Sequence, residues 1–295
     1  MPVEHEDIPS SRAHLGYILL ALAALFWGLN GPFARYFFSL GLTVPEFAFL
    51  RCATGACCFG LHAVFRREWR VDLPDIPKLL LFGMAGLGLF NLAYQTSVYE
   101  SGAALAVILL YTAPAWVALA SRVFLGHRLS LRTLTAISIA MAGVLCITLA
   151  GSAEARLSWL GIAAGLVSAL LYALHFPWNF RWRGIYSPIT LYGYAMLGGA
   201  ILLAPFAGCT ARPALVWLQV VPGLALITYL PYLCYGLGMR GVNPTPAAVI
   251  VSLEPVVGCV VAYLWWNEQF TLPGWLGAGL VIGAVFLLIR GTQDA

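Results

Sequence analysis

The sequence has very little charge. Only 9% of its 295 residues are Asp, Glu, Lys or Arg, whereas 61% are hydrophobic. A soluble surface needs about a quarter of its residues charged, so 16 basic and 12 acidic residues are too few to coat a globule of this length. The solvent around this chain must therefore be lipid. The net charge of +4 comes with no basic stripe along the chain, which excludes a nucleic-acid-binding protein.

The sequence also lacks the cysteine and catalytic patterns of other classes of protein. Its seven cysteines are scattered, and six of them lie in hydrophobic runs, where a thiol behaves as a small hydrophobic group. Cys57 and Cys58 are adjacent rather than spaced as C-x-x-C, and no histidine lies at metal-ligand spacing from them, so we expect no metal, redox centre or other cofactor. No nucleotide-binding loop of the type G-x-x-x-x-G-K-[ST] is present, so ATP is not the direct energy source.

Ten hydrophobic windows, each long enough to cross a bilayer, follow one another along the chain. A bilayer core of about 30 Å needs about 20 residues of helix. The sequence therefore predicts an all-α membrane protein with ten transmembrane helices and short loops. The windows are 15–34, 45–65, 79–99, 101–121, 133–153, 157–180, 184–208, 213–239, 243–267 and 269–289. The first window continues past a signal-peptide-like Ala21-Leu22-Ala23 and follows an acidic tail, so we interpret it as a retained span.

Lys and Arg lie mostly on one side of this arrangement. If the N-terminus is cytoplasmic, twelve basic residues lie in cytoplasmic segments and three lie on the opposite side. Cytoplasmic loops of membrane proteins carry an excess of Lys and Arg. This predicts a multi-pass protein of the bacterial inner membrane with two cytoplasmic tails, residues 1–14 and 291–295. An impermeant thiol reagent should then reach Cys209 from outside the cell.

The two halves of the chain, 15–153 and 157–290, are similar to each other. Shifts of 145 and 141 residues align chemically similar residues of corresponding spans. The matched pairs include Trp27 with Tyr172, Asn30 with His175, Pro32 with Pro177, Tyr94 with Tyr235 and Pro114 with Pro255. Each half therefore holds five spans. Because five is odd, the second repeat crosses the membrane in the opposite sense, and inverted repeats of this kind are typical of transporters.

Motifs in the fourth and ninth spans resemble those of a known family. Residues 252–257 (SLEPVV) precede 267–271 (NEQFT), and the first half has 111–114 (YTAP) and 126–130 (GHRLS) in the same places. With Arg51 early in the second span, these motifs resemble the EamA-type repeat of the drug/metabolite transporter superfamily over nearly the whole chain. The resemblance implies ten helices, two inverted bundles and a central substrate path. Within the superfamily the chain resembles the YddG-type exporters of aromatic amino acids.

The chain departs from that pattern at two positions. Ala113 stands where the second half has Glu254, and His127 stands where members of the family often carry an acidic residue.

Four spans carry polar and aromatic residues on one helix face. Residues spaced i, i+3, i+4 and i+7 lie on one side of a helix, and lipid cannot satisfy Asn, Gln or His. We therefore expect these faces to line a path for an amphipathic ligand with a ring and a polar head. With Tyr111 of the fourth span added, the candidate substrate-path residues are Trp27, Asn30, Asn91, Tyr94, Gln95, Tyr111, Tyr172, His175, Asn179, Tyr229, Tyr232 and Tyr235. Any single one could instead hydrogen-bond a neighbouring helix, which contributes roughly 0.6–2 kcal/mol.

Three ionisable residues inside the spans are candidates for ion coupling or for a structural role. Glu254 lies near the membrane midplane, where a carboxyl group needs a proton or a partner, and the following Pro255 predicts local unwinding of the helix. His175 could bind substrate, take up a proton or be structural. Arg51 is expected to extend back to the membrane surface, with Glu46 as its candidate partner.

Prolines and small residues suggest where helices bend and where they pack. The hinge candidates are Pro32, Pro114, Pro177, Pro231 and Pro255, although membrane helices tolerate proline. Gly279 and Gly283 form a G-x-x-x-G pattern on the tenth span, and such residues let helices approach closely. We expect them to pack inside the monomer or at a dimer face, in a monomer or weak homodimer.

These features together predict a secondary transporter rather than an enzyme. It would export amino acids, preferably aromatic ones, and related amphipathic metabolites by alternating access. Its partners would be the small-molecule substrate, the lipid bilayer and, if flux is coupled through Glu254 or His175, protons. An alternative in the same superfamily is an exchanger of organic phosphates or nucleotide sugars, which would need Lys or Arg well inside the spans. An intramembrane enzyme would need a catalytic pair at mid-membrane, and the sequence offers none.

Overall fold

A computed structural model describes residues 10–101, 103–124, 126, 130–150, 158–208, 211–266 and 272–291. The described residues are almost entirely helical and contain no strand. His127, Cys209 and the motif 267–271 lie outside them. The predicted fold class is confirmed: the chain is an all-α membrane protein whose ten spans form two inverted repeats of five.

Each repeat builds its five spans from both continuous and interrupted helices. The first repeat comprises α1 (Ser10–Gly28) with α2 (Asn30–Ser39), α3 (Val44–Arg66), α4 (Ile76–Phe82) with the π-helix η1 (Gly83–Leu89) and α5 (Phe90–Ser101), α6 (Ala103–Leu110) with α7 (Ala113–Phe124), and α8 (Leu131–Ala150). The second comprises α9 (Trp159–Ala173) with α10 (His175–Trp182), α11 (Pro188–Leu203) with the 3-10 turn η2 (Ala204–Phe206), α12 (Ala214–Gly238), α13 (Pro244–Val251) with α14 (Glu254–Trp266), and α15 (Leu272–Gly291).

The helix interruptions fall at equivalent positions of the two repeats. The first span breaks at Leu29 and the sixth at Leu174, which is 145 residues later. The fourth span breaks at residues 111–112 and the ninth at 252–253, which is 141 residues later. The same local irregularity is therefore built twice, once in each orientation across the membrane.

Four of the five predicted hinge prolines follow these breaks directly. Pro32, Pro114, Pro177 and Pro255 each lie at the second or third residue of the helix that begins after the break. A proline fits the first turn of a helix because the N–H that it lacks would have no partner inside that helix. Pro231 differs, since it lies inside the continuous helix α12.

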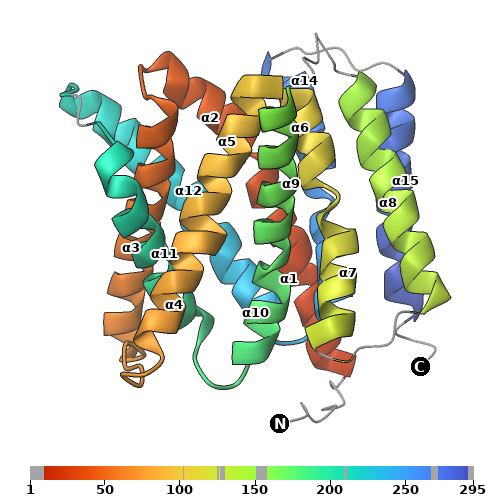
Figure 1. Cartoon of the computed structure of the whole chain (residues 1–295), viewed down its shortest axis with the longest axis horizontal. Coiled ribbons are helices and arrows are strands. Elements are labelled where there is room, and N and C mark those ends of the chain that lie inside the picture. The colour runs from red at the N-terminus through yellow and green to blue at the C-terminus, as the bar shows by residue number, and fades with distance from the viewer. Residues whose placement is uncertain are drawn as a thin grey trace.

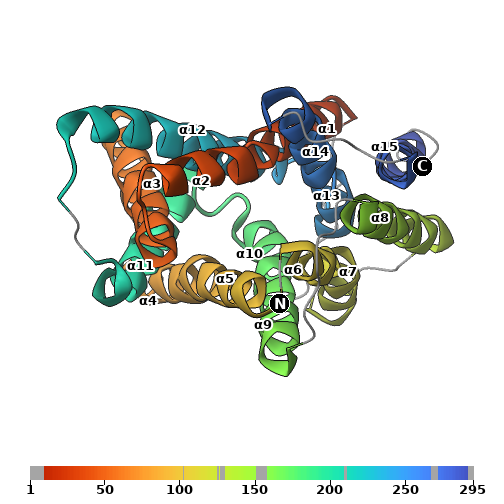
Figure 2. The same ribbon diagram turned by 90° about the horizontal axis from the view of Figure 1, so that it is seen from above.

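The helices stand side by side across the molecule, and α8 and α15 form a pair at one end (Figures 1 and 2). These two helices approach closely at Gly143, where a Cβ atom would lie 2.7 Å from the Gly277 carbonyl oxygen. Gly279 and Gly283 are exposed and have no described atom within 4 Å of a Cβ position. The fifth and tenth spans thus pack together inside the monomer, but through glycines other than Gly279 and Gly283, whose role at a dimer face stays a prediction.

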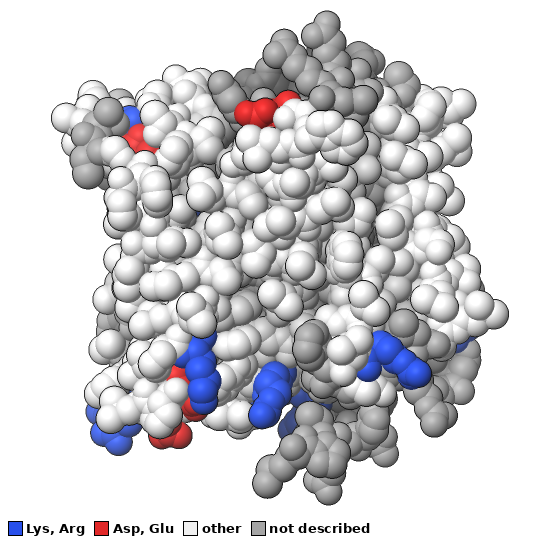
Figure 3. All heavy atoms as spheres, viewed as in Figure 1, with Lys and Arg blue, Asp and Glu red and all other residues white. Residues whose placement is uncertain are grey.

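Basic side chains gather on one face of the molecule, along the lower edge of Figure 3. The start of α1 and the end of α15 lie on this face (Figure 1). The described basic residues at helix ends and loops of this face are Arg12, Arg66, Arg67, Arg70, Lys78, Arg122, Arg132, Arg181, Arg183 and Arg240. Arg212 lies on the opposite face, just before α12. The charge asymmetry is thus a property of the folded molecule, while its cytoplasmic assignment stays a prediction.

Candidate substrate site

Rings from both repeats meet in a continuous group deep in the protein, which we call the aromatic cluster. Neighbouring rings in it have centroids 4.9 to 6.3 Å apart, within the range of favourable aromatic pairs. Its members are Trp27, Phe82, Phe90, Tyr172, His175, Phe176, Tyr192, Tyr232 and Tyr235. Trp27, Phe82 and Phe90 come from the first repeat and the other six from the second.

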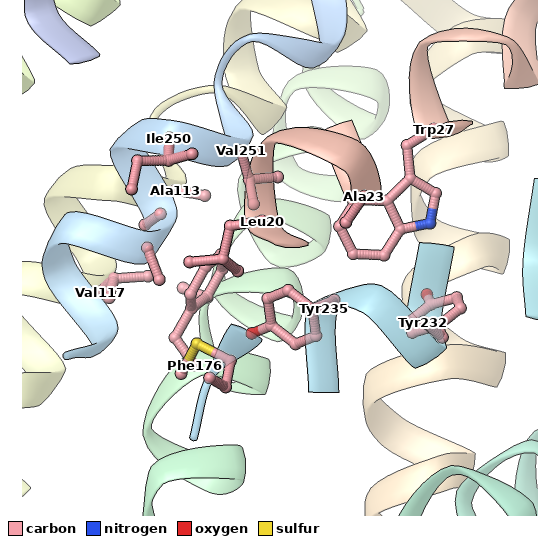
Figure 4. Packing of buried hydrophobic residues seen from close by; sticks show 14 of the residues in the cluster. Leu20, Ala23, Trp27, Ala113, Val117, Phe176, Tyr232, Tyr235, Ile250 and Val251 are labelled. Atoms are coloured by element: carbon pink, nitrogen blue, oxygen red, sulfur yellow. The ribbon is translucent and has the colours of Figure 1, made fainter. Parts of the chain in front are cut away.

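Trp27 joins α1 to α12 in the aromatic cluster. It lies in the last turn of α1, just before the break at Leu29, and only 5% of it is exposed. Its ring centroid is 5.0 Å from that of Tyr232 and 5.4 Å from that of Tyr235. Figure 4 shows the indole facing these two rings, with Phe176 on the far side of Tyr235. The two tyrosines lie three residues apart on α12 and so point to one side of that helix.

His175 begins α10 directly after the second-repeat break and is 2% exposed. Its Nδ1 atom lies 3.2 Å from the Tyr172 carbonyl oxygen, and its Nε2 atom is buried without a hydrogen-bond partner among the described residues. Its ring packs edge-on against Phe82 and Phe90. The described residues contain no group of three or more His, Cys, Asp and Glu that could hold a metal ion.

Several buried polar atoms at this depth have no hydrogen-bond partner among the described residues. A buried polar group without a partner costs about 1–3 kcal/mol, and such groups are uncommon in folded proteins. Besides Ser97 Oγ on α5, which is outside the predicted path, they include Asn30 Oδ1, the hydroxyl oxygens of Tyr111, Tyr172 and Tyr235, and His175 Nε2. The last five atoms belong to residues predicted to line the substrate path. They are available to bond the polar atoms of a ligand.

Glu254 is the first residue of α14, directly after the break at 252–253. The N-terminal end of a helix favours a negative charge. The carboxyl group lies within electrostatic range of four tyrosine hydroxyls, those of Tyr94, Tyr111, Tyr172 and Tyr232. The Tyr111 hydroxyl approaches it without the geometry of a formed hydrogen bond. Glu254 as a whole residue is half-buried, while its carboxyl group lies deep among protein atoms.

Arg51 does not extend back to the membrane surface, so that expectation is wrong. It is 8% exposed, donates from Nε to the Thr228 hydroxyl of α12 at 3.4 Å, and lies over the Phe47 ring at 5.7 Å. Thr228 lies one turn before Tyr232 on α12, and Arg51 is within electrostatic range of both Tyr232 and Glu254. Through Thr228, Arg51 is thus joined to α12, the helix that carries Tyr232 and Tyr235 of the aromatic cluster.

The expected pairing of Glu46 with Arg51 is also wrong. The Glu46 carboxylate instead accepts two hydrogen bonds from Arg212, one of them 2.8 Å long, and both side chains are covered by protein. Arg212 also donates to the Gly41 carbonyl oxygen at 2.7 Å. The hydrogen bond to Glu46 raises the pKa of Arg212 above its usual value. This pair joins the start of α3 to the segment before α12, on the face opposite the basic one.

Four predicted path residues have other surroundings. The Tyr229 hydroxyl lies 2.6 Å from His62 Nδ1 on α3, and Asn91 donates to the Leu87 carbonyl oxygen of the π-helix at 2.7 Å. Asn179 donates to the His175 carbonyl oxygen and, at 2.8 Å, to the Tyr192 hydroxyl. Gln95 is half-buried on α5. Tyr229 and Asn91 thus have structural partners, whereas Asn179 bonds two members of the aromatic cluster, His175 and Tyr192.

Phe82, Phe90 and Tyr192 were not among the residues predicted from the sequence. Tyr192 is 1% exposed, and its ring centroid lies 4.9 Å from that of Tyr232. Its span is hydrophobic on all sides, so no polar face marked it. Phe82 and Phe90 lie directly before and after the π-helix η1. Because a π-helix turns differently from an α-helix, α-helical spacing does not predict that these two side chains share a face. The available signal was the glycine-rich segment 83–88, which indicates an irregular helix.

This arrangement of two five-helix units around a shared polar and aromatic centre matches a known family. The EamA-like transporter family matches residues 14–149 and 159–290, one match for each repeat. The chain belongs to the EamA-like transporter family. The resemblance to the drug/metabolite transporter superfamily is therefore confirmed.

Individual relatives agree with this membership. The chain is 31% identical over 285 residues to an uncharacterized transporter of Archaeoglobus fulgidus, covering 93% of this chain and 96% of that one. It is 26% identical over 274 residues to the threonine/homoserine exporter RhtA of Escherichia coli K12, covering 90% of this chain and 88% of that one. A solved crystal structure superposes with a TM-score of 0.78 over 97% of this chain and 99% of that one, at 17% identity, which shows the shared fold.

Proposed function

We propose that this EamA-like transporter exports amino acids, with a preference for those with aromatic side chains, and acts as a secondary transporter rather than an enzyme. The observation that carries this proposal is the aromatic cluster with its unpartnered polar atoms, deep in the protein and built from both repeats. An aromatic amino acid presents the same combination, a ring with polar groups at one end. Its ring could pair with those of the cluster, at about 0.5–1.5 kcal/mol per pair beyond its burial.

The family relationship supports the amino-acid class in a coarser way. RhtA, with which the chain shares 26% identity, is named as an exporter of threonine and homoserine, which are not aromatic. The preference for aromatic side chains therefore rests on the rings of this chain, Trp27, Tyr172 and Tyr232 in particular, and on its resemblance to YddG-type exporters. An exchanger of organic phosphates would need several buried cations, and among the described residues Arg51 is the one Lys or Arg that is buried within a span.

Alternating access would use the paired helix breaks. Breaks at Leu29 and Leu174 border the aromatic cluster directly, through Trp27 and His175. Because the equivalent breaks lie in oppositely oriented repeats, bending at one set would open one face, and bending at the other set would open the other face. In this proposal Pro32, Pro114, Pro177 and Pro255 fix where the helices resume. The basic face would be cytoplasmic, with both termini on that side, in the bacterial inner membrane.

An export assay in cells tests the proposed function. Bacteria that express the chain would be loaded with phenylalanine by feeding a phenylalanine-containing dipeptide, and the free amino acid would be measured in the medium over time. We expect phenylalanine to appear several-fold faster than from cells with the empty vector, and faster than threonine supplied in the same way. Equal rates with and without the chain, for both amino acids, would contradict amino-acid export. Faster release of threonine alone would contradict the aromatic preference.

A further inference from the structure

Two charged side chains of opposite sign lie inside the membrane-spanning part and do not pair with each other. Arg51 comes from α3 of the first repeat and Glu254 from α14 of the second. They lie within electrostatic range of one another, but no ion pair joins them in the described part of the chain. Arg51 donates from Nε to Thr228 and lies over the Phe47 ring, and both contacts leave the terminal N–H groups of the guanidinium for another partner.

This arrangement differs from a structural salt bridge. A buried charge is stable only when it is paired, and leaving one partner uncompensated costs several kcal/mol. A protein that needed these groups for stability alone would place them in contact, as it does with Glu46 and Arg212. Arg51 and Glu254 instead lie near the same ring pair without pairing. Arg51 bonds Thr228, one turn before Tyr232, and the Glu254 backbone adjoins Gly28, the residue after Trp27. Two unpaired groups of opposite charge near the Trp27 and Tyr232 rings suit a ligand that carries both charges.

We propose that Arg51 and Glu254 together recognise the two charged groups of an α-amino acid, with Arg51 binding its carboxylate and Glu254 its ammonium group. This inference rests on the proposed amino-acid export and specifies how the same site selects its substrate. Arginine binds carboxylates through two parallel N–H donors, which makes it suited to this role. The Tyr111 and Tyr172 hydroxyls, buried beside Glu254 without hydrogen-bond partners, supply further contacts for the ammonium end.

The ring of the substrate then falls on the aromatic cluster. Tyr232 is within electrostatic range of both Arg51 and Glu254, and its ring contacts Trp27, His175 and Tyr192. A ligand held by its two charged groups would therefore direct its side chain into these rings. A molecule with only one charge would leave the opposite buried charge of the protein uncompensated. The site should consequently discriminate against amines and carboxylates that share the same ring.

Competition in reconstituted vesicles tests this. The probe is labelled phenylalanine counterflow, with unlabelled phenylalanine, phenethylamine (no carboxylate) or 3-phenylpropionate (no amino group) as competitors. With the unmodified chain, each analogue should compete at least about tenfold more weakly than phenylalanine. Arg51→Gln should bring phenethylamine to within about threefold of phenylalanine, and Glu254→Gln should do the same for 3-phenylpropionate. The matched control is the ion pair of the exposed Arg66 with the half-buried Glu68, at the end of α3, whose Gln variants should keep the original ranking.

The outcomes separate this inference from the proposed function. One outcome is that the unmodified chain transports phenylalanine while both variants keep its ranking of the three competitors. In that case Arg51 and Glu254 do not bind the charged groups of the substrate, although amino-acid export stands. If the unmodified chain transports no amino acid, both proposals are wrong. Where a Gln variant is not recovered as a folded protein, Arg51→Lys and Glu254→Asp replace it. These keep the charge, and should keep the ranking while raising the half-saturating phenylalanine concentration; an altered ranking in them would overturn the inference.

Discussion

Replacing Trp27 with alanine is expected to slow phenylalanine export by about tenfold or more. Trp27 is 5% exposed, contacts the rings of Tyr232 and Tyr235, and lies next to the break that separates α1 from α2. One aromatic pair contributes about 0.5–1.5 kcal/mol, and 1.4 kcal/mol corresponds to a tenfold change in affinity. The substitution also removes the support that positions the two tyrosines. Initial rates at low substrate concentration, normalised to the amount of folded protein, measure the effect.

Trp159→Ala is the matched control for this substitution. Trp159 is the first residue of α9 and is 87% exposed, as expected for a residue of the membrane interface. Its replacement should leave the export rate within about twofold of the original, because exposed positions contribute little to a folded protein. Trp27→Phe keeps a ring at the site and should retain most of the activity. Equal losses from Trp27→Ala and Trp159→Ala would show that the aromatic cluster has no special role.

Gly83→Ala is expected to destabilise the whole protein. Gly83 begins the π-helix η1, and a Cβ atom there would overlap the backbone of Ala195 on α11. Gly198 on α11 meets the Leu80 backbone in the same close manner. Because the obstructing atoms are backbone, a side chain cannot move aside, and the two helices must separate. We expect the unfolding temperature in detergent to fall by about 10 °C or more, or the folded protein to be lost.

Gly60→Ala provides the comparison for this prediction. Gly60 lies on α3, also inside a span, and a Cβ atom there would meet no described atom within 4 Å. An alanine at this position should leave the unfolding temperature unchanged or raise it slightly, since alanine favours helix. Size-exclusion profiles and thermal unfolding of both variants in the same detergent give the measurement. Similar unfolding temperatures for the two would mean that α4 and α11 do not pack as closely as described.

The fold could be predicted from the sequence because it follows from two simple features, the long hydrophobic segments and the repeat of one half of the chain in the other. Ten hydrophobic windows separated by charges define ten spans, and an odd number of spans per repeat makes the repeats inverted. The helix breaks were only partly visible. Pro32, Pro114, Pro177 and Pro255 indicated four of them, but Pro231 lies in an unbroken helix, and the π-helix at Gly83 contains no proline.

The candidate site was harder to predict, because it depends on side-chain directions across helices. Spacing along single helices correctly selected Trp27 on α1 and Tyr232 and Tyr235 on α12, whose rings contact one another. It also selected Tyr229, which contacts His62 on α3 instead. Arg51 was expected at the membrane surface because its depth along α3 is small. Its actual direction depends on Thr228 of α12, a contact between residues 177 positions apart that no local pattern reveals.

The most direct test of the account is phenylalanine counterflow in proteoliposomes that contain the purified chain. Vesicles preloaded with unlabelled phenylalanine should accumulate labelled phenylalanine from outside, with saturable kinetics and without added ATP. We expect this accumulation, and a weaker signal for threonine. The accumulation of phenylalanine should be lost in Trp27→Ala but not in Trp159→Ala. No saturable accumulation of phenylalanine, tyrosine, tryptophan or threonine, together with accumulation of an organic phosphate, would contradict the central claim that this chain transports amino acids.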